Sequence, residues 1–424
     1  MCDKLKVVLL CHYWSAEAEE MVPRKHHFHE LSPWIQERIN LFKDKDDIEL
    51  HIVSPNYTSN KTIEVQKDGI YFHFYHYAPS LLSLFCYPFV RLMLRHDEPY
   101  KISERIANTV TKFSVVKKCA GRIIDSIKPD ILHVFGTEVP DSSAGAVTVL
   151  SKYPVVISIQ GYAYKTTISN YILDRMFRKE RIKFEKLVNT NAIYKMGDYE
   201  TDDFKPFENG QIRIISGGNI TRVPKVDATK AQKVYDVSFF GRVSADKGVE
   251  DLVRALGVLS RKGLYLKAII IGKCTSAYQK QLVSILQEYT SESLLEFSGF
   301  VEDHEDVYRI AASSIMVALP TRVDLMPNTI REAIAMGLPV VTSDAGFITT
   351  LNKDQESVAI HHVEDIEALA SAIEKVYLDK DYREMLISNG RKTFQEQYSM
   401  ENVYKGTIEA YKKIYDLEKM RLSK

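Results

Sequence analysis

Residues 320–341 read PTRVDLMPNTIREAIAMGLPVV, and this stretch decides how the rest of the chain is interpreted. Its order predicts a loop, a helix, a tight stop and a strand. Apolar and small residues recur at the helical positions i, i+3, i+4 and i+7, namely Ile330, Ala333, Ile334 and Gly337. Gly337 followed by Pro339 ends the predicted helix. The stripe is narrow, which suits a helix that packs on a sheet.

The start of this helix gathers polar groups. Thr329 with Glu332 three residues later fits a capping box, so the helix is expected to begin near Thr329, with Pro327 just upstream. Asp324 lies in the preceding loop. A loop carboxylate, the N–H groups of a helix start and a first-turn glutamate suit a ligand that carries both hydroxyls and phosphate. The simpler alternative is that Glu332 only caps the helix and Asp324 is only solvated.

Length and composition predict a globular protein of two domains. The chain has 424 residues, with 45% hydrophobic and 26% charged residues. Acidic and basic residues number 56 each, so the overall charge gives no reason to expect a nucleic-acid partner.

The cysteines and the hydropathy pattern favour the cytoplasm. The five cysteines are scattered, odd in number and without a CxxC pair, which indicates reduced thiols rather than disulfides or a zinc site. No secretory signal is expected, because the apolar run of residues 7–11 is too short and suits a buried strand. No stretch of transmembrane length is expected either, because the longest apolar stretch, residues 80–94, contains Pro88 and Arg91.

A second polar segment lies in residues 241–248, GRVSADKG, between a predicted strand and a predicted helix. Glycine lets the backbone come close to a ligand, and Arg242 and Lys247 place two cations beside a helix start. Such a segment can hold a diphosphate without a metal. Charge on a solvated loop is the alternative.

Together the two segments resemble retaining family 4 glycosyltransferases, also called glycosyl transferases group 1. The 320–341 stretch is similar to the segment E-G-F-P-N-x-x-x-E-A-x-A-x-G-x-P-V of that family, and residues 241–248 are similar to its G-R-x-x-x-x-K-G segment. Asp324 stands where the first glutamate is expected, and Leu325 and Met326 replace the usual Gly-Phe. The family positions that are kept are Pro327, Asn328, Glu332, Ala333, Ala335, Gly337, Pro339 and Val340.

The resemblance implies the α/β GT-B fold, two Rossmann-like doubly wound domains that face a cleft. Strand and helix patterns alternate through both halves of the sequence, as this fold requires. We expect an acceptor-side domain in residues 1–216, with residues 404–424 crossing back onto it, and a nucleotide-sugar-binding domain in residues 217–403.

The resemblance also implies the site residues. Asp324, Glu332, Arg242 and Lys247 are expected to be catalytic. The donor, a nucleotide diphosphate sugar, is expected to contact Gly241, Phe300, Val301, Pro327, Asn328, Thr329 and Gly346. The expected acceptor-side residues are His133, Gln160 and Gly161, where Gln160 stands in place of a histidine that is common in the family. The alternative for His133 is a histidine of the core. No cofactor and no metal is expected.

The first domain departs from the family in one loop. Residues 14–29 contain no glycine, whereas family members usually have a Gly-rich loop there. His26, His27 and His29 have no placed carboxylate or cysteine partner, so a metal site is not predicted. They either line the cleft or lie on the surface.

Residues 80–95, SLLSLFCYPFVRLMLR, have two interpretations. Their leucines and aromatics, followed by basic residues, suit contact with the surface of a membrane, as in family members that use lipid-linked acceptors. A buried helix beneath an acceptor site explains the same composition.

The resemblance therefore implies a retaining hexosyltransferase that transfers a sugar to a glycan or lipid-linked glycan in cell-surface polysaccharide synthesis. The expected location is the cytoplasm, either free or at the inner face of the membrane. The departures of the sequence from the family leave alternatives open. They are a catalytically silent subunit or binding protein, and another GT-B activity such as a phosphorylase, an inverting transferase or a nucleotide-sugar epimerase.

Overall fold

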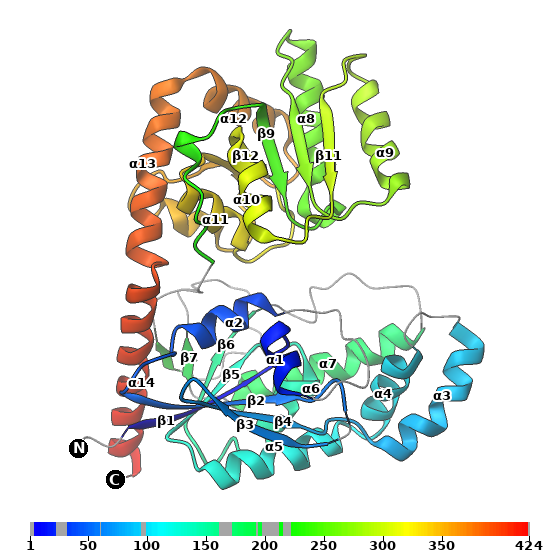
Figure 1. The fold of residues 1–424 in the computed structure, drawn as a ribbon, viewed down its shortest axis with the longest axis vertical. Helices are drawn as coiled ribbons and strands as arrows, with labels where there is room; N and C mark the ends of the chain where they lie inside the picture. Colours follow the sequence, from blue (N-terminus) through cyan, green and yellow to red (C-terminus); the bar gives the residue numbers. More distant parts are fainter. Residues whose placement is uncertain are drawn as a thin grey trace. The chain divides into compact units, whose positions relative to one another are not determined.

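The chain divides into two compact units, shown in Figure 1. The computed structural model describes residues 4–22, 32–59, 61–94, 99–160, 172–191, 194–196, 212–214 and 222–422. The first unit is formed by Met1–Ile220 together with Val403–Lys424, and the second by Thr221–Asn402. The sequence placed the boundary at residues 216/217, and the structure divides the chain at residues 220/221.

The described part of the first unit contains one eight-stranded sheet, in the order β3-β4-β2-β1-β5-β6-β7-β8. Only the β3–β4 pair is antiparallel among these strands. The strands and helices of this unit are β1 (Leu5–Cys11), α1 (Ala16–Met21), α2 (Pro33–Asn40), β2 (Ile48–Pro55), β3 (Ile63–Lys67), β4 (Ile70–Tyr75), α3 (Ser80–Leu94), α4 (Pro99–Val110), α5 (Ser114–Ile127), β5 (Ile131–Phe135), α6 (Pro140–Ser143), β6 (Val155–Ser158), α7 (Ile172–Asn191), β7 (Tyr194–Met196) and β8 (Ile212–Ile214).

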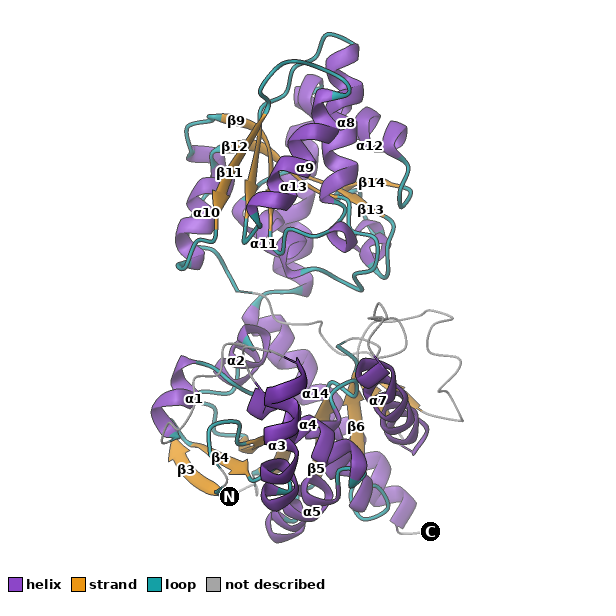
Figure 2. Ribbon diagram, turned by 90° about the vertical axis from the view of Figure 1, so that its right-hand side faces the viewer, coloured by secondary structure: helices purple, strands orange, loops and turns teal. Residues whose placement is uncertain are grey.

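The second unit contains a six-stranded sheet among its described residues, in the order β11-β10-β9-β12-β13-β14, and each of its pairs is parallel. Its elements are β9 (Tyr235–Phe240), α8 (Val249–Arg261), β10 (Ala268–Ile271), α9 (Ser276–Gln287), β11 (Leu295–Gly299), α10 (His304–Ala312), β12 (Ser314–Leu319), α11 (Asn328–Met336), β13 (Val340–Ser343), β14 (Ala359–His361), α12 (Ile366–Leu378), α13 (Lys380–Gln397) and the start of α14 (Met400–Leu422). Helices lie on both faces of the sheet (Figure 2).

Helix α11 starts differently from the prediction. Its N-cap is Pro327, without a side-chain cap, so the capping box expected of Thr329 and Glu332 is wrong. Thr329 lies inside the first turn, and its hydroxyl donates to the carbonyl oxygen of Phe240 at 3.2 Å. The end of the helix is confirmed, because Gly337 is the C-cap in the left-handed conformation.

The last helix joins the first unit through buried polar contacts. In α14, the Tyr411 hydroxyl lies 2.7 Å from Nδ1 of His133, and Thr407 accepts a hydrogen bond from Arg38 at 3.1 Å. Farther along, Glu418 accepts a hydrogen bond from the Tyr194 hydroxyl at 2.7 Å. These contacts explain why Val403–Lys424 belongs to the first unit although it follows the second in sequence.

Helix α3 presents large apolar side chains to solvent. Phe85 is 82% exposed and Leu81 is 87% exposed, and Leu84, Phe89 and Leu92 are also exposed, whereas Ser83 and Val90 are buried. The interpretation of this segment as a buried floor is therefore wrong. No helix in the described ranges is long and apolar enough to cross a membrane.

Candidate active site

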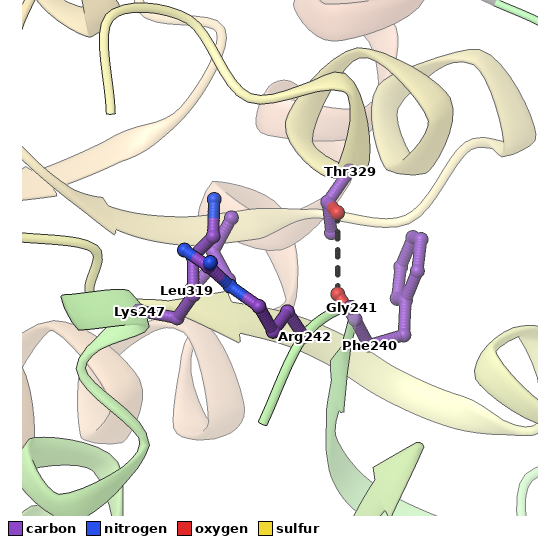
Figure 3. A pocket seen from close by; sticks show the side chains of 6 residues that line it. All are labelled: Phe240, Gly241, Arg242, Lys247, Leu319 and Thr329. Carbon is purple, nitrogen blue, oxygen red and sulfur yellow. Dashed lines mark hydrogen bonds between the residues drawn. The ribbon is translucent and has the colours of Figure 1, made fainter. Parts of the chain in front are cut away.

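A pocket of about 240 Å³ lies where β9 and β12 of the second unit end. Figure 3 shows its lining, which consists of Phe240, Gly241, Arg242, Lys247, Leu319 and Thr329. Ligands of open parallel sheets bind outside the carboxyl ends of the strands, which is where these residues lie. Pockets that enclose a whole small molecule usually measure about 300–1,000 Å³, so this one is smaller than a typical enclosing site.

Two segments that are far apart in sequence meet closely at this pocket. Gly248 has φ +73°, and a Cβ there would lie 1.8 Å from the carbonyl oxygen of Pro320. Only glycine fits both the left-handed backbone and this approach. The 241–248 segment is thereby held against the start of the 320–341 stretch.

Two cations extend toward the pocket. Lys247 Nζ lies 2.5 and 2.6 Å from the two carboxylate oxygens of Asp324, and both side chains are 20% exposed. Arg242 is ion-paired with Asp246, four residues along the chain, and its side chain is 68% exposed. The guanidinium of Arg242 can therefore turn toward a ligand with little loss of buried contact, since exposed ion pairs contribute little to stability.

Glu332 lies beside a buried tyrosine. Burial of Tyr308 and the neighbouring Glu332 carboxylate together raise the pKa of the Tyr308 hydroxyl well above its usual value. Tyr308 also meets the Phe240 ring edge-on, with 6.4 Å between the ring centroids. Glu332 is half-buried at this position, on the same helix as the pocket residue Thr329.

Four other residues predicted to bind the donor are not part of the pocket lining. Phe300 and Val301 follow β11 and do not line the pocket, and the Phe300 side chain is 73% exposed. Asn328 Oδ1 accepts a hydrogen bond from the buried Arg331. Gly346 packs against the loop of Asp324, because a Cβ at Gly346 would lie 2.3 Å from the Asp324 carbonyl oxygen.

The residues expected on the acceptor side lie in the first unit. His133 is completely buried, and its two ring nitrogens contact the hydroxyls of Tyr411 (2.7 Å) and Ser158 (2.8 Å). Burial, with Arg38 nearby, holds the pKa of His133 well below its usual value. Gln160 follows β6, and Gly161 lies outside the described residues, as do His26, His27 and His29.

Three contacts of the site were not anticipated from the sequence. The Thr321 hydroxyl donates to Asp324 at 2.6 Å, Arg322 binds the buried Asp251 carboxylate through two nitrogens, and Tyr308 adjoins Glu332. Thr321 stands three residues before Asp324, a spacing that suits a local side-chain contact. No group of metal-binding side chains was found among the residues that the structure describes.

Comparison with known proteins shows the class of fold and then a family match in the second unit. A sucrose-phosphate synthase from Thermosynechococcus elongatus superposes with a TM-score of 0.65 at 15% identity, covering 98% of this chain and 100% of that one. Anabaena Alr3699/HepE, solved in complex with UDP and glucose, superposes with a TM-score of 0.61 at 14% identity, covering 96% and 98%. These likenesses show the GT-B fold.

The family match lies in the second unit. Residues 225–393 match the model of the family named Glycosyl transferases group 1. An uncharacterized glycosyltransferase of Methanocaldococcus jannaschii, MJ1607, is 26% identical over 199 residues, 46% of this chain and 50% of that protein. An O-antigen chain mannosyltransferase B of Escherichia coli is 24% identical over 252 residues, 56% and 65% of the two chains. The match spans less than two thirds of either relative. Residues 225–393 thus form a domain of the glycosyl transferases group 1 family.

Proposed function

We propose that this chain is a retaining glycosyltransferase. It transfers a sugar from a nucleotide diphosphate sugar to a glycan or lipid-linked glycan during synthesis of a cell-surface polysaccharide. The observation that carries the proposal is the pocket in which Arg242 and Lys247 lie beside the start of α11, with Asp324 at the Lys247 amino group. The O-antigen relative and the HepE complex with UDP and glucose support this class of acceptor and donor.

Arg242 and Lys247 would hold the diphosphate of the donor. Negative charge grows on the diphosphate as the bond to the sugar breaks, so both cations stabilise the transition state as well as the bound donor. The positive end of the helix dipole at the start of α11 favours the same anion. These groups supply the positive charge that a metal ion provides in other transferases, so the proposed reaction is metal-independent.

The two carboxylates would position the rest of the donor. Glu332, half-buried beside Tyr308, accepts hydrogen bonds from the ribose hydroxyls in this proposal. Asp324 accepts hydrogen bonds from hydroxyls of the transferred hexose. Charge-assisted hydrogen bonds of this kind are stronger than neutral ones, which makes both residues strong determinants of donor affinity.

Thermal unfolding with a panel of uridine, guanosine and adenosine diphosphate sugars tests the donor. A bound donor raises the melting temperature, because it binds only the folded chain. The matching donor is then used for turnover with glycan acceptors, and the anomeric configuration of the product is determined. A panel in which no donor changes the melting temperature would count heavily against an enzyme.

Two variants separate the proposal from its alternatives. Turnover by the purified chain that disappears in Arg242→Ala and in Glu332→Ala excludes a catalytically silent subunit. Free nucleotide diphosphate and an altered sugar, formed with no acceptor present, would instead indicate an epimerase. An inverted product would show an inverting transferase.

We also propose that the first unit contacts the cytoplasmic face of a membrane through α3. Five exposed leucine and phenylalanine side chains lie on this helix. In the same unit, α7 carries exposed cations along one face, at Arg175, Lys179, Lys183 and Lys186. Apolar side chains combined with cations suit an anionic bilayer. The described cysteines Cys11, Cys86, Cys119 and Cys274 are unpaired, which supports a reducing compartment.

Sedimentation with lipid vesicles tests this contact. The protein is expected to sediment with vesicles that contain anionic lipid more than with neutral vesicles, and the double variant Leu81→Ser with Phe85→Ser is expected to stay in the supernatant. Equal sedimentation of the variant and the unaltered chain would exclude α3 as the contact. Glu374→Gln, a change on the second unit, serves as the control.

A further inference from the structure

The two charged groups that the proposed function assigns to different parts of the donor are bound to each other here. Lys247 Nζ contacts both carboxylate oxygens of Asp324, at 2.5 and 2.6 Å. The Thr321 hydroxyl donates to one of these oxygens at 2.6 Å. Each charge therefore has a partner before any ligand arrives, and a ligand that takes Lys247 must replace that partner.

The backbone around Asp324 is tied to the segment that carries Lys247. The N–H group of Arg322 donates to the carbonyl oxygen of Asp246 at 2.9 Å. The guanidinium of Arg322 binds the Asp251 carboxylate with two hydrogen bonds, of 2.9 and 2.6 Å, and the Asp251 side chain is 4% exposed. Paired donors in this geometry fix orientation as well as distance.

The same loop is confined on its other side. Gly346 has φ +57°, and a Cβ there would lie 2.3 Å from the carbonyl oxygen of Asp324. The N–H group of Phe347 donates to the carbonyl oxygen of Leu325 at 2.8 Å. With the backbone held from both sides, Lys247 and Asp324 separate by rotation of their side chains rather than by movement of the loop.

We infer that the Lys247–Asp324 ion pair makes this site discriminate between a nucleotide diphosphate sugar and the free nucleotide diphosphate. The inference rests on the proposed function. When a diphosphate takes Lys247, the Asp324 carboxylate loses its cation and remains close to a second anion. The hydroxyls of a donor sugar supply new hydrogen bonds to Asp324, whereas the free nucleotide diphosphate supplies none.

The consequence for turnover concerns product release. After transfer, the sugar leaves with the acceptor and the nucleotide diphosphate remains. Asp324 then competes with the diphosphate for Lys247, and formation of the ion pair favours release. Asp324 is thus a specificity-determining residue that opposes inhibition by the product.

Isothermal titration calorimetry tests the inference with UDP, GDP and ADP and with UDP-glucose, GDP-glucose and ADP-glucose. The unaltered chain is compared with Asp324→Asn, which keeps the volume and removes the charge, and with Asp324→Ala. A partly exposed ion pair contributes up to about 1 kcal/mol, so the free nucleotide diphosphate should bind Asp324→Asn about fivefold more tightly. The nucleotide diphosphate glucose should bind the variant no more tightly than it binds the unaltered chain.

A matched control is Glu374→Gln. Like Asp324, Glu374 forms an ion pair with a lysine: its carboxylate lies 3.4 Å from Nζ of Lys262. This pair is in the same unit and away from the pocket. This variant should leave both affinities unchanged. Thermal unfolding without ligand shows whether each variant is folded, and Asp324→Ala provides the measurement if Asp324→Asn is not.

The outcomes distinguish this inference from the proposed function. If the unaltered chain binds both ligands and the Asp324 variants bind the free nucleotide diphosphate with unchanged or weaker affinity, the ion pair does not compete and the inference is overturned. The donor proposal then stands. If the unaltered chain binds none of the six compounds, both are overturned.

Discussion

The loops that follow the first strand of each sheet are built in opposite ways. After β1, Tyr13 and Trp14 are completely buried, and the Ser15 side chain caps α1 by accepting a hydrogen bond from the Ala18 N–H. After β9, Gly241 and Gly248 bracket two cations, and a pocket remains. One loop fills the carboxyl end of its sheet with side chains, and the other leaves it open.

The difference shows which loop leaves room for a ligand at the end of its sheet, and in the proposed function that ligand is the donor diphosphate. A backbone can come close to an anion only where no side chain intervenes, which glycine permits and buried aromatic rings prevent. Trp14 and Tyr13 both pack against the Phe74 ring, so the first loop belongs to the core of its unit. The same position in an α/β sheet is thus filled by core side chains in one unit and left open as a pocket in the other.

The largest expected effect tests the filled loop. Trp14→Ala should lower the free energy of unfolding by about 3–5 kcal/mol, because it leaves a cavity in place of a buried aromatic side chain. Chemical denaturation measures this. The control Phe85→Ala, at an exposed aromatic on α3, should change stability by no more than about 0.5 kcal/mol. Equal effects of the two changes would mean that Trp14 is not part of the core.

The next effect tests the open loop. Gly248→Ala should lower the free energy of unfolding by about 3 kcal/mol, because the alanine combines backbone strain with a clash against the Pro320 carbonyl. Gly69→Ala is the matched control, because Gly69 has nearly the same φ, +75°, with nothing within 4 Å of the added Cβ. The control should lower the free energy of unfolding by only about 1 kcal/mol. A similar loss for both would show that the close approach to Pro320 is unimportant.

A third prediction concerns activity. Lys247→Ala should lower kcat/KM by about 100-fold, the usual effect of removing one group that stabilises transition-state charge. Steady-state kinetics measures it, with the donor that the thermal-unfolding panel identifies. Lys262→Ala, at the far end of α8, should leave kcat/KM unchanged. Full activity of Lys247→Ala would mean that Arg242 and the start of α11 stabilise the diphosphate without Lys247.

The smallest effect depends on pH and concerns His133. Its pKa in the folded chain is well below 6.5, so below pH 6.5 the unfolded chain binds a proton there that the folded chain does not. Stability should therefore fall as the pH drops below 6.5, by at most about 1.4 kcal/mol per pH unit for one proton, and His133→Gln should remove this part of the slope. Denaturation at pH 5.5 and 7.5 compares the two chains. If stability changes equally with pH in the two chains, His133 is not held uncharged by burial in the folded chain.

The sequence predicted the parts of the site that depend on local pattern. The glycines and cations of residues 241–248 come together with Asp324, as spacing and resemblance indicated, because β9 and β12 are neighbours in a parallel sheet. Gly337 ends α11 for a local reason, since its left-handed backbone follows from the residue itself.

Contacts between distant segments were beyond prediction. The Thr329–Glu332 spacing fits a capping box, yet the Thr329 hydroxyl bonds to Phe240, which is 89 residues away. The Arg322–Asp251 pair joins residues 71 apart, and nothing in either local sequence indicates the partner. The composition of α3 fits a buried helix and an exposed helix equally well. Apolar content alone does not show whether other parts of the protein pack over the helix.

The passage of α14 from one unit to the other has a consequence for folding during synthesis. The second unit is continuous in sequence, Thr221–Asn402, whereas the first needs Val403–Lys424. Its contact between Arg38 and Thr407 joins residues 369 apart, and that between His133 and Tyr411 joins residues 278 apart. Until α14 leaves the ribosome, His133 and Tyr194 lack these partners. The unit that is translated first is therefore completed last, after the second unit has had time to fold.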